Sequence, residues 1–140
     1  MKIYLASPWF NEEEDFFYKH VIEKMREQGH EVYVPKEHEI PNAWDLKNED
    51  WAREVFLADI EAIRACEEVW VINYGLYSDS GTAWECGFAY GIGKPVRQLL
   101  ISNRKNQGRF SLMMVNGCEE CDFATNYLYG EFTCVEIEQK

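Results

Sequence analysis

The segment from Val69 to Val96 constrains the fold more than any other part of the sequence. The apolar run Val69-Trp70-Val71-Ile72 has the composition of a buried strand, and Asp79-Ser80-Gly81-Thr82 after it contains residues that cap a helix. Gly93-Lys94-Pro95 ends that helix just before the next apolar run. A strand, a helix and a strand in this order predict a parallel βαβ unit, with Glu85 in the first turns of its helix. Open α/β sheets place their chemistry at such a strand-to-helix junction.

The remaining sequence repeats this alternation of apolar runs and amphipathic stretches. Strands are expected at residues 2–6, 31–34, 68–73, 95–101 and 132–137. Helices are expected at residues 12–28, 48–66, 82–92 and 111–115, with loops at 36–47 and 102–108. We therefore predict an α/β fold, doubly wound in the flavodoxin or Rossmann manner, with a central, mainly parallel sheet of about five strands. A chain of 140 residues is expected to form one domain over residues 1–140.

Composition narrows the class of partner. An apolar content of 46% with 15% aromatic residues indicates a globular protein. The formal charge of -11 argues against a nucleic-acid duplex or an anionic membrane as the main partner, because both require a basic face. An uncharged nucleoside is not excluded. No apolar run approaches the length of a membrane span, and we expect no signal peptide. Five cysteines, an odd number, indicate reduced thiols and a cytoplasmic protein.

Cys118-Glu119-Glu120-Cys121 has the CxxC spacing of zinc and redox sites. No second CxxC or HxxxH pair completes a set of four ligands, and the neighbouring glutamates disfavour the thiolate that such sites need. We therefore interpret the motif as a surface turn and predict no metal site.

The candidate site residues in the sequence are carboxylates and aromatic residues. No GxGxxG follows the first strand and no P-loop motif is present, which disfavours an enzyme that uses a nicotinamide cofactor or a nucleoside triphosphate. An oxocarbenium-like transition state at a glycosidic carbon needs a carboxylate on one face of the sugar and a proton donor for the leaving group. Glu85 and Asp59 suit these two roles, although a helix-start charge and a solvated side chain explain their positions equally well. The candidate carboxylates and the aromatic residues near them are Asp59, Asp79, Glu85, Tyr4, Trp9, Phe10, Tyr74 and Tyr77.

Three segments of the chain resemble the nucleoside 2-deoxyribosyltransferase family. They are residues 2–13, residues 56–63 and residues 79–96, with a weaker match at residues 111–114. The pattern Asp-x-Gly-Thr-Ala-Trp-Glu-x-Gly in the third segment is long and specific. The resemblance implies a pentosyltransferase that exchanges the bases of 2′-deoxynucleosides in nucleotide salvage, acting on purine and pyrimidine bases without a metal or organic cofactor. It also implies a homo-oligomer whose sites are shared between subunits.

The resemblance also implies roles for single residues. Glu85 aligns with the family's catalytic glutamate, which attacks the anomeric carbon of the deoxyribosyl group and forms a covalent intermediate. Tyr4 aligns with a tyrosine that orients this glutamate. Asp59 aligns with the aspartate that protonates the leaving base and activates the incoming one, and Asp79 with the residue that holds the sugar hydroxyls. Double displacement on this plan keeps the β configuration.

Around the substrate, the chain partly departs from the family. Trp9 and Phe10 match aromatic residues near the base. The family's Asn-Leu-Met, which reaches a neighbouring subunit's site and binds the 5′-hydroxyl, is Ser111-Leu112-Met113 here. Related nucleotide hydrolases carry serine at this position and bind a 5′-phosphate, but Asp79 would repel a phosphate and favours a nucleoside. Glu39 stands where transferases usually have a base-binding glutamine. Since an ionised glutamate only accepts hydrogen bonds, it favours bases that present N–H donors, unless it belongs to a solvated surface loop.

Three functions remain open at this point. The sequence favours a base-exchanging 2-deoxyribosyltransferase with a 2′-deoxynucleoside and a free nucleobase as its partners. Ser111 keeps open a nucleoside or nucleoside 5′-monophosphate N-glycoside hydrolase with water as the acceptor. A non-catalytic nucleotide-binding module on the same fold is the third possibility, and the complete set of carboxylates argues against it.

Overall fold

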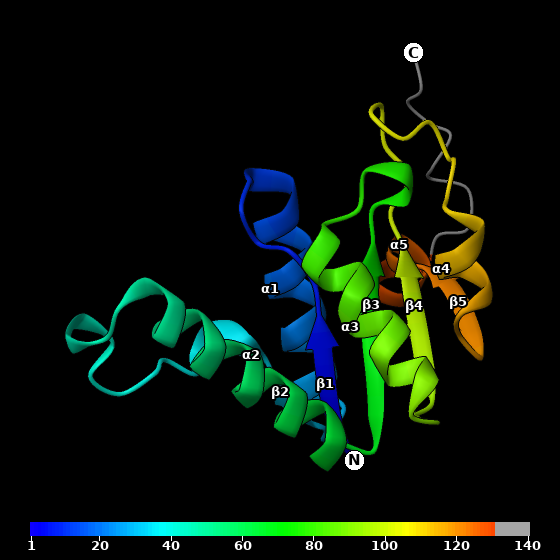
Figure 1. Cartoon of the computed structure of the whole chain (residues 1–140). Helices are drawn as coiled ribbons and strands as arrows, with labels where there is room; N and C mark the ends of the chain where they lie inside the picture. The colour runs from blue at the N-terminus through cyan, green and yellow to red at the C-terminus, as the bar shows by residue number, and fades with distance from the viewer. Residues whose placement is uncertain (131–140) are drawn as a thin grey trace.

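The computed structural model describes residues 1–130 and is built around a five-stranded parallel sheet with the strand order β2-β1-β3-β4-β5 (Figure 1). The strands are β1 (Lys2–Ala6), β2 (Glu31–Tyr33), β3 (Glu68–Asn73), β4 (Val96–Leu100) and β5 (Glu120–Phe123). The helices are α1 (Glu12–Glu27), α2 (Asn48–Ala65), α3 (Ser80–Gly91), α4 (Leu112–Asn116) and α5 (Ala124–Tyr129). The predicted doubly wound α/β fold is confirmed.

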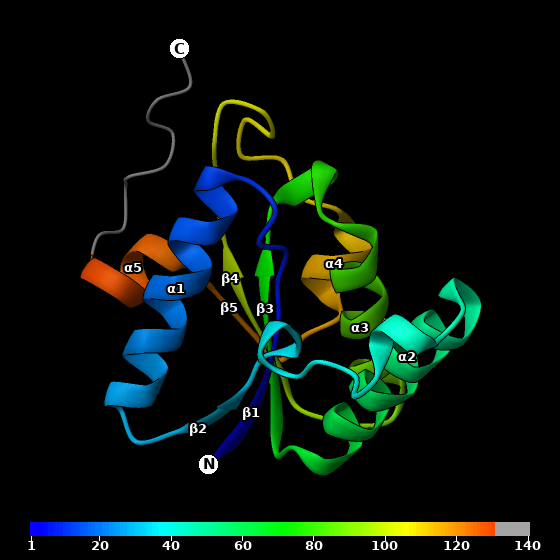
Figure 2. The ribbon, with the colours of Figure 1, turned by 90° about the vertical axis from the view of Figure 1, so that its left-hand side faces the viewer.

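Helices cover both faces of the sheet. α1 and α5 lie on one face, and α2, α3 and α4 lie on the other (Figure 2). Alternate strand residues point to opposite faces, so Leu5 and Ile72 pack in the core beneath α1 while Tyr4 and Val71 pack in the core beneath α3. The buried residues of β3 form a nearly continuous apolar run, as expected for a central parallel strand.

The sequence did not indicate the fifth strand of the described sheet. The expected strand at residues 132–137 lies outside the described residues, and the fifth strand is β5 at Glu120–Phe123, paired with β4. Two of its four residues are exposed and the other two are half-buried. Such a short, polar edge strand lacks the apolar alternation by which strands are recognised.

α2 is much less buried than its apolar stripe predicts. Of its residues only Ile63 is buried, while Phe56 is 49% exposed and Leu57 is 47% exposed. α3, in contrast, buries Thr82, Cys86 and Ala89 against the sheet. In Figure 1 the N-terminal half of α2 and the loop before it extend away from the sheet.

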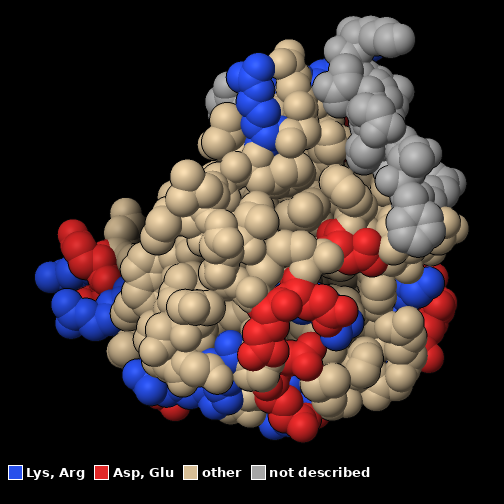
Figure 3. Space-filling view, turned by 90° about the vertical axis from the view of Figure 1, so that its right-hand side faces the viewer, with Lys and Arg blue, Asp and Glu red and all other residues tan. Residues whose placement is uncertain are grey.

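Charge is unevenly distributed over the surface. On the side of the molecule that carries α4 and β5, acidic side chains gather low on the face and a broad uncharged area lies beside them (Figure 3). No helix within residues 1–130 has the length and apolar character needed to cross a membrane.

Candidate active site

The start of α3 places two carboxylates at the carboxyl end of the sheet. Asp79 is the N-cap of this helix, and its Oδ2 accepts hydrogen bonds from the backbone N of Thr82 at 2.9 Å and from Thr82 Oγ1 at 3.1 Å. A Cβ on Gly81 would come within 3.2 Å of that oxygen, so a glycine suits this tight turn. Glu85 follows in the second turn of the helix.

Glu85 is held by a tyrosine on the central strand β1. The Tyr4 hydroxyl donates a short hydrogen bond to Glu85 Oε2. Tyr4 is completely buried, and burial together with the Glu85 charge raises the pKa of Tyr4 far above its ordinary value. The tyrosine therefore remains a neutral donor at any physiological pH. This single bond fixes one carboxylate oxygen and leaves Oε1 for another partner.

A cavity of about 570 Å³ lies in front of Glu85. Its volume falls in the range typical of small-molecule sites. Asp59, Asp79 and Glu85 supply its carboxylates, and most of the remaining lining is apolar. The structure therefore brings together the three carboxylates that the sequence singles out. The other lining residues include Trp9, Phe10, Pro35, Phe56, Ile60, Ile63 and Trp84.

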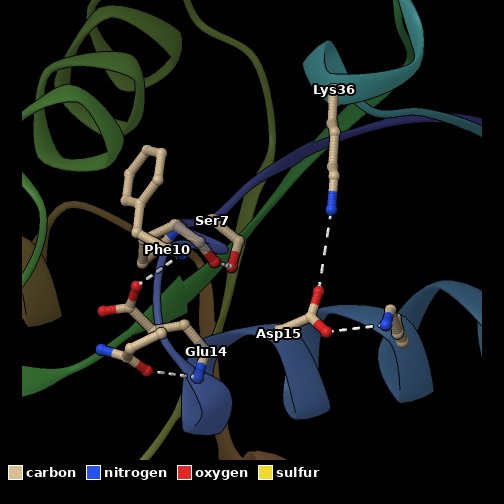
Figure 4. Close-up of polar contacts among 8 residues, drawn as sticks. Ser7, Phe10, Glu14, Asp15 and Lys36 are labelled. Carbon is tan, nitrogen blue, oxygen red and sulfur yellow. Dashed lines mark hydrogen bonds and ion pairs between the residues drawn. The ribbon is translucent and has the colours of Figure 1, made fainter.

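The loop between β1 and α1 brings Trp9 and Phe10 to this cavity. The carboxamide Oδ1 of Asn11 caps α1 by accepting from Glu14 N at 2.8 Å, and Glu14 Oε1 in return accepts from Phe10 N at 3.0 Å (Figure 4). Trp9 packs against the ring of Tyr18, with the centroids 5.5 Å apart. Phe10 is 70% exposed, so its ring stands at the rim of the cavity, free to contact a flat ligand.

Phe56 and Trp84 form a second aromatic wall that sequence reasoning missed. Their ring centroids are 5.2 Å apart at an interplanar angle of 63°. Each ring belongs to a helix that also carries a carboxylate of the cavity: Phe56 lies one turn before Asp59, and Trp84 directly precedes Glu85. These spacings were the available signal.

Burial raises the proton affinity of both carboxylates. For Glu85, burial raises the pKa to about 7; the hydrogen bond from Tyr4 opposes this rise, and the charges of Asp59 and Asp79 add to it. Burial raises the pKa of Asp59 to about 6, against a lowering effect of His38. The two groups together therefore exchange protons near neutral pH, which is where acid–base catalysis is most efficient.

An aromatic stack that the sequence did not indicate extends from Tyr4. Tyr4 and Tyr33 are stacked with centroids 5.5 Å apart, and Tyr33 and His38 are stacked at 4.0 Å with an interplanar angle of 9°. Tyr4 and Tyr33 are register partners on neighbouring strands, which explains the first contact. The stack brings the His38 ring from the loop after β2 to the neighbourhood of Asp59.

Three other sequence candidates lie away from this cavity. Ser111 is the N-cap of α4 and lines a different hollow with Leu76, Tyr90 and Met113. Glu39 is exposed in the loop before α2 and does not line the cavity. Tyr74 is buried in the core on the α1 side of the sheet, so it cannot stack on a ligand.

Two buried amides connect the parts of the molecule that carry these residues. Asn73 Nδ2 donates to Gln98 Oε1 at 2.9 Å, and Asn73 Oδ1 accepts from Gly75 N and Ser78 Oγ in the loop that leads to Asp79. Gln98 Nε2 donates a short hydrogen bond to the carbonyl of Met114 in α4. Both amides are completely buried and fully paired, so they hold the β3–α3 loop and α4 in one arrangement.

No group of three or more His, Cys, Asp or Glu side chains within residues 1–130 is arranged to hold a metal ion. The arrangement that the cavity does contain is a tyrosine-bound carboxylate, a second carboxylate with a raised pKa, and aromatic walls. It suits nucleophilic attack on a carbon whose leaving group needs a proton.

Comparison with known proteins agrees with this chemistry. The family model for nucleoside 2-deoxyribosyltransferase matches residues 3–125. A 2-deoxyribosyltransferase from Bacillus psychrosaccharolyticus is 31% identical, with a TM-score of 0.77, over 94% of this chain and 93% of that chain. Two solved structures share the fold: a conserved protein of Enterococcus faecalis V583 (22% identity, TM-score 0.73, 91% and 94% coverage) and a CMP N-glycosidase of Clostridium botulinum (18%, 0.60, 92% and 95%). No curated protein matches the chain in sequence.

Proposed function

The chain belongs to the nucleoside 2-deoxyribosyltransferase family, and we propose that it exchanges the bases of 2′-deoxynucleosides through a covalent bond between deoxyribose and Glu85. One observation carries the proposal. A carboxylate oriented by a buried tyrosine and a second carboxylate with a raised pKa face the same aromatic-walled cavity. The enzyme class is that of the pentosyltransferases, which are glycosyltransferases.

In the first step, Glu85 Oε1 attacks C1′ of the deoxynucleoside while Asp59 donates its proton to the departing base. The C1′–N bond breaks and its electron pair leaves with the base. The proton from Asp59 neutralises the negative charge that the base would otherwise carry. Tyr4 holds Oε2, so Oε1 is presented to the sugar in one orientation. The developing positive charge on the sugar lies beside Glu85 and Asp79.

In the second step, another base attacks C1′ from the side that the first base left. Asp59, now ionised, takes a proton from the incoming base, and the ester bond to Glu85 breaks. Two inversions at C1′ leave the β configuration unchanged. The apolar and aromatic lining limits competition by water for the intermediate.

The proposed roles require a particular protonation state of the pair, with the proton on Asp59 and the charge on Glu85. The Asp59 charge is one of the causes that raise the pKa of Glu85. When Asp59 holds a proton, that cause is removed and Glu85 ionises more readily. Even so, the pKa of about 6 for Asp59 lies below the pKa of about 7 for Glu85, so the productive state, with Asp59 protonated and Glu85 ionised, is the minor of the two singly protonated forms. Its share is greatest at pH values between about 6 and 7.

Binding of the substrate is assigned to the remaining residues. Asp79 Oδ2 is engaged in the helix cap, which leaves Oδ1 to accept hydrogen bonds from the sugar hydroxyls. Trp9 and Phe10 stack on the base. Glu39, exposed in the loop after β2, is assigned the N–H donors at the edge of the base.

The position of Ser111 supports a homo-oligomer with shared sites. Ser111 does not line the Glu85 cavity of its own chain, but it starts a short helix whose next two residues, Leu112 and Met113, are 72% and 77% exposed. Leu76 and Tyr90 add further exposed apolar surface. A neighbouring copy seated on this surface would bury it and receive Ser111 at the 5′-hydroxyl of its own substrate. The described cysteines are free thiols, which supports a cytoplasmic location.

The test is an incubation of the protein with one 2′-deoxynucleoside, with and without a second free base. We expect the new deoxynucleoside, in the β configuration, only when the second base is present. Glu85→Ala should abolish the exchange, while Glu12→Ala, which removes an exposed carboxylate of α1, should leave it unchanged. A 2′-fluoro-2′-deoxynucleoside should leave a mass adduct on Glu85. Full exchange by Glu85→Ala would refute the proposal.

A nucleoside or nucleoside 5′-monophosphate N-glycoside hydrolase is the second candidate, because Ser111 can bind either a hydroxyl or a phosphate. The same incubation separates the two. Free deoxyribose formed at the same rate with and without an acceptor base would indicate the hydrolase. Preference for the 5′-monophosphate over the nucleoside would further indicate that Ser111 binds phosphate.

A further inference from the structure

The CxxC segment lies at the end of α4 with its two thiols in contact. Cys118 Sγ and Cys121 Sγ are 3.1 Å apart. Cys118 is half-buried and Cys121 is exposed, whereas Cys66 and Cys86 are buried. The pair is therefore both pre-assembled and open to a small reagent.

The charge around the two cysteines is less negative than the sequence suggests. Two glutamates separate the cysteines, but Arg97 Nη2 forms an ion pair with Glu120 Oε2 at 2.6 Å, which offsets one of the two negative charges. A disulfide needs an S–S bond of about 2.05 Å, so the two sulfur atoms would have to approach by about 1 Å. Cys118 lies in the turn between α4 and β5, and Cys121 lies in the edge strand β5, where so small a movement disturbs little packing.

We propose that Cys118 and Cys121 form a reversible disulfide when the protein meets a small hydroperoxide. The Cys118 thiolate attacks one peroxide oxygen, the O–O bond breaks, and an alcohol or water leaves after taking a proton. The sulfenic acid on Cys118 is then attacked by Cys121, the S–O bond breaks, and water leaves with the proton of the Cys121 thiol. Overall, two thiols lose two electrons and two protons, and the peroxide is reduced by two electrons.

The order of the two steps follows from the surroundings of Cys121. Burial, the hydrogen bond with Cys118 and the charges of Cys118 and Cys86 together raise the pKa of Cys121 to about 12. Cys121 is therefore a thiol that donates to Cys118, and Cys118 reacts first. Once Cys118 is an uncharged sulfenic acid, the charge of Cys118 and its hydrogen bond no longer raise the pKa of Cys121, and Cys121 can attack.

Oxidation would also change the end of α4. The carbonyl oxygen of Val115 lies 3.1 Å from Cys118 Sγ and 3.7 Å from Cys121 Sγ, so either thiol can donate to it. A disulfide has no S–H donor, so this carbonyl near the C-terminal end of the helix loses both partners. The carboxylates of the cavity belong to other helices and keep their own hydrogen bonds.

The experiment treats the full chain with hydrogen peroxide, blocks the remaining thiols with N-ethylmaleimide, and maps the peptides by mass spectrometry. We expect a loss of about 2 Da, a Cys118–Cys121 disulfide, and recovery of both thiols with dithiothreitol. Cys118→Ser and Cys121→Ser should each abolish the disulfide, while the matched variant Cys66→Ser should not. Glutathione disulfide, an anionic oxidant, should react more slowly because the exposed Glu119 lies between the two cysteines.

Three results would overturn the proposal. In the first, both cysteines are fully alkylated after the peroxide treatment. In the second, a disulfide joins either of them to another cysteine. In the third, zinc added alone is retained at one ion per chain and protects both thiols from peroxide, which would make the pair a metal site. Since none of these readouts measures base exchange, the outcome does not depend on the proposed enzymatic function.

Discussion

α3 and α2 each bring one carboxylate to the same cavity, but the protein supports the two helices very differently. Glu85 stands on α3, which packs against the sheet, is capped by Asp79 and receives the Tyr4 hydroxyl at its carboxylate. Asp59 stands on α2, whose N-terminal cap has no side-chain hydrogen bond and of which only Ile63 is buried. The difference fits the proposed roles. A nucleophile must approach C1′ from one direction. A general acid that protonates several different bases tolerates a less constrained position, which also lets it reach each of them.

The largest expected effect comes from removing the charge on the firmly held helix. Glu85→Gln keeps the size of the side chain and can still accept the Tyr4 hydrogen bond, but it cannot form the covalent ester. We expect base exchange to fall by at least about 10³-fold for every base, without rescue by a better leaving group. Steady-state exchange assays with several donor nucleosides measure this. Residual activity that depends on the leaving group would mean that Glu85 is not the nucleophile.

Asp59→Asn should give a large loss that the leaving group can restore. Loss of a general acid costs about 10²- to 10⁴-fold, and we expect this for exchange from ordinary deoxynucleosides. With 7-methyl-2′-deoxyguanosine the base is already positively charged and leaves without a proton, so release of the base should return to within about 10-fold of the unchanged protein. Equal loss on both donors would assign Asp59 a structural role and remove the contrast between the two carboxylates.

The two substitutions that lower activity, Glu85→Gln and Asp59→Asn, should raise the stability of the protein, and Glu85→Gln should raise it more. The pKa of Glu85 is raised to about 7, so between its unfolded value and 7 the native state binds more protons than the unfolded state. Stability therefore falls as the pH rises through this range. Glu85→Gln should stabilise the protein at pH 8 by about 1 to 3 kcal/mol, and the gain should vanish near pH 4, where both states are protonated. Asp59→Asn should show a smaller gain over a range that ends near pH 6.

Urea unfolding at fixed protein concentration measures these differences, since an oligomer would make stability depend on concentration. Glu12→Gln, at an exposed position in the first turn of α1, is the matched control and should show no such pH dependence. A Glu85→Gln variant that is less stable than the unchanged protein at pH 8 would show that the buried charge is fully compensated in the native state.

The regions that the sequence predicts well are those where one element satisfies several local rules at once. β3 has the bounds Glu68–Asn73 that its apolar run indicates, and α3 begins and ends within two residues of its cap and its glycine-proline stop. β5 at Glu120–Phe123 was missed because its pairing with β4 is decided by the fold and not by its own polar sequence. The exposure of Phe56 was missed for a related reason. Helical spacing shows that an apolar face exists, but it does not show whether this chain or another one covers it.

The residues of the candidate site also fall into those that a local sequence pattern reveals and those that only the fold brings together. Asp79 and Glu85 could be found because the sequence places them at the start of a helix that follows a strand, where a parallel sheet gathers side chains. Asp59 lies inside α2 and could be found from its place at the edge of the apolar stripe and from the family resemblance. Tyr33 and His38 could not, since their stack on Tyr4 depends on the register of β1 against β2 and on the path of the following loop. Neither is visible in a local pattern of residues.

The smallest expected effect tests how Glu85 is held. The Tyr4 hydroxyl lowers the pKa of Glu85 against the effect of burial, so Tyr4→Phe should raise it. Glu85 must be ionised to attack, and Asp59 must be protonated to donate. Because the pKa of Glu85 is the higher of the two, Glu85 sets the basic limb of kcat/KM against pH. We expect that limb to move to higher pH by roughly 0.5 to 1, equivalent to about 1 kcal/mol, while the acidic limb, which Asp59 sets, stays in place. Tyr33→Phe is the matched control, because the Tyr33 ring stacks on Tyr4 without a hydrogen bond to Glu85 in the described structure. Movement of both limbs together would mean that Tyr4 acts on the cavity as a whole, and the firm hold on the nucleophile would then not be specific to Glu85.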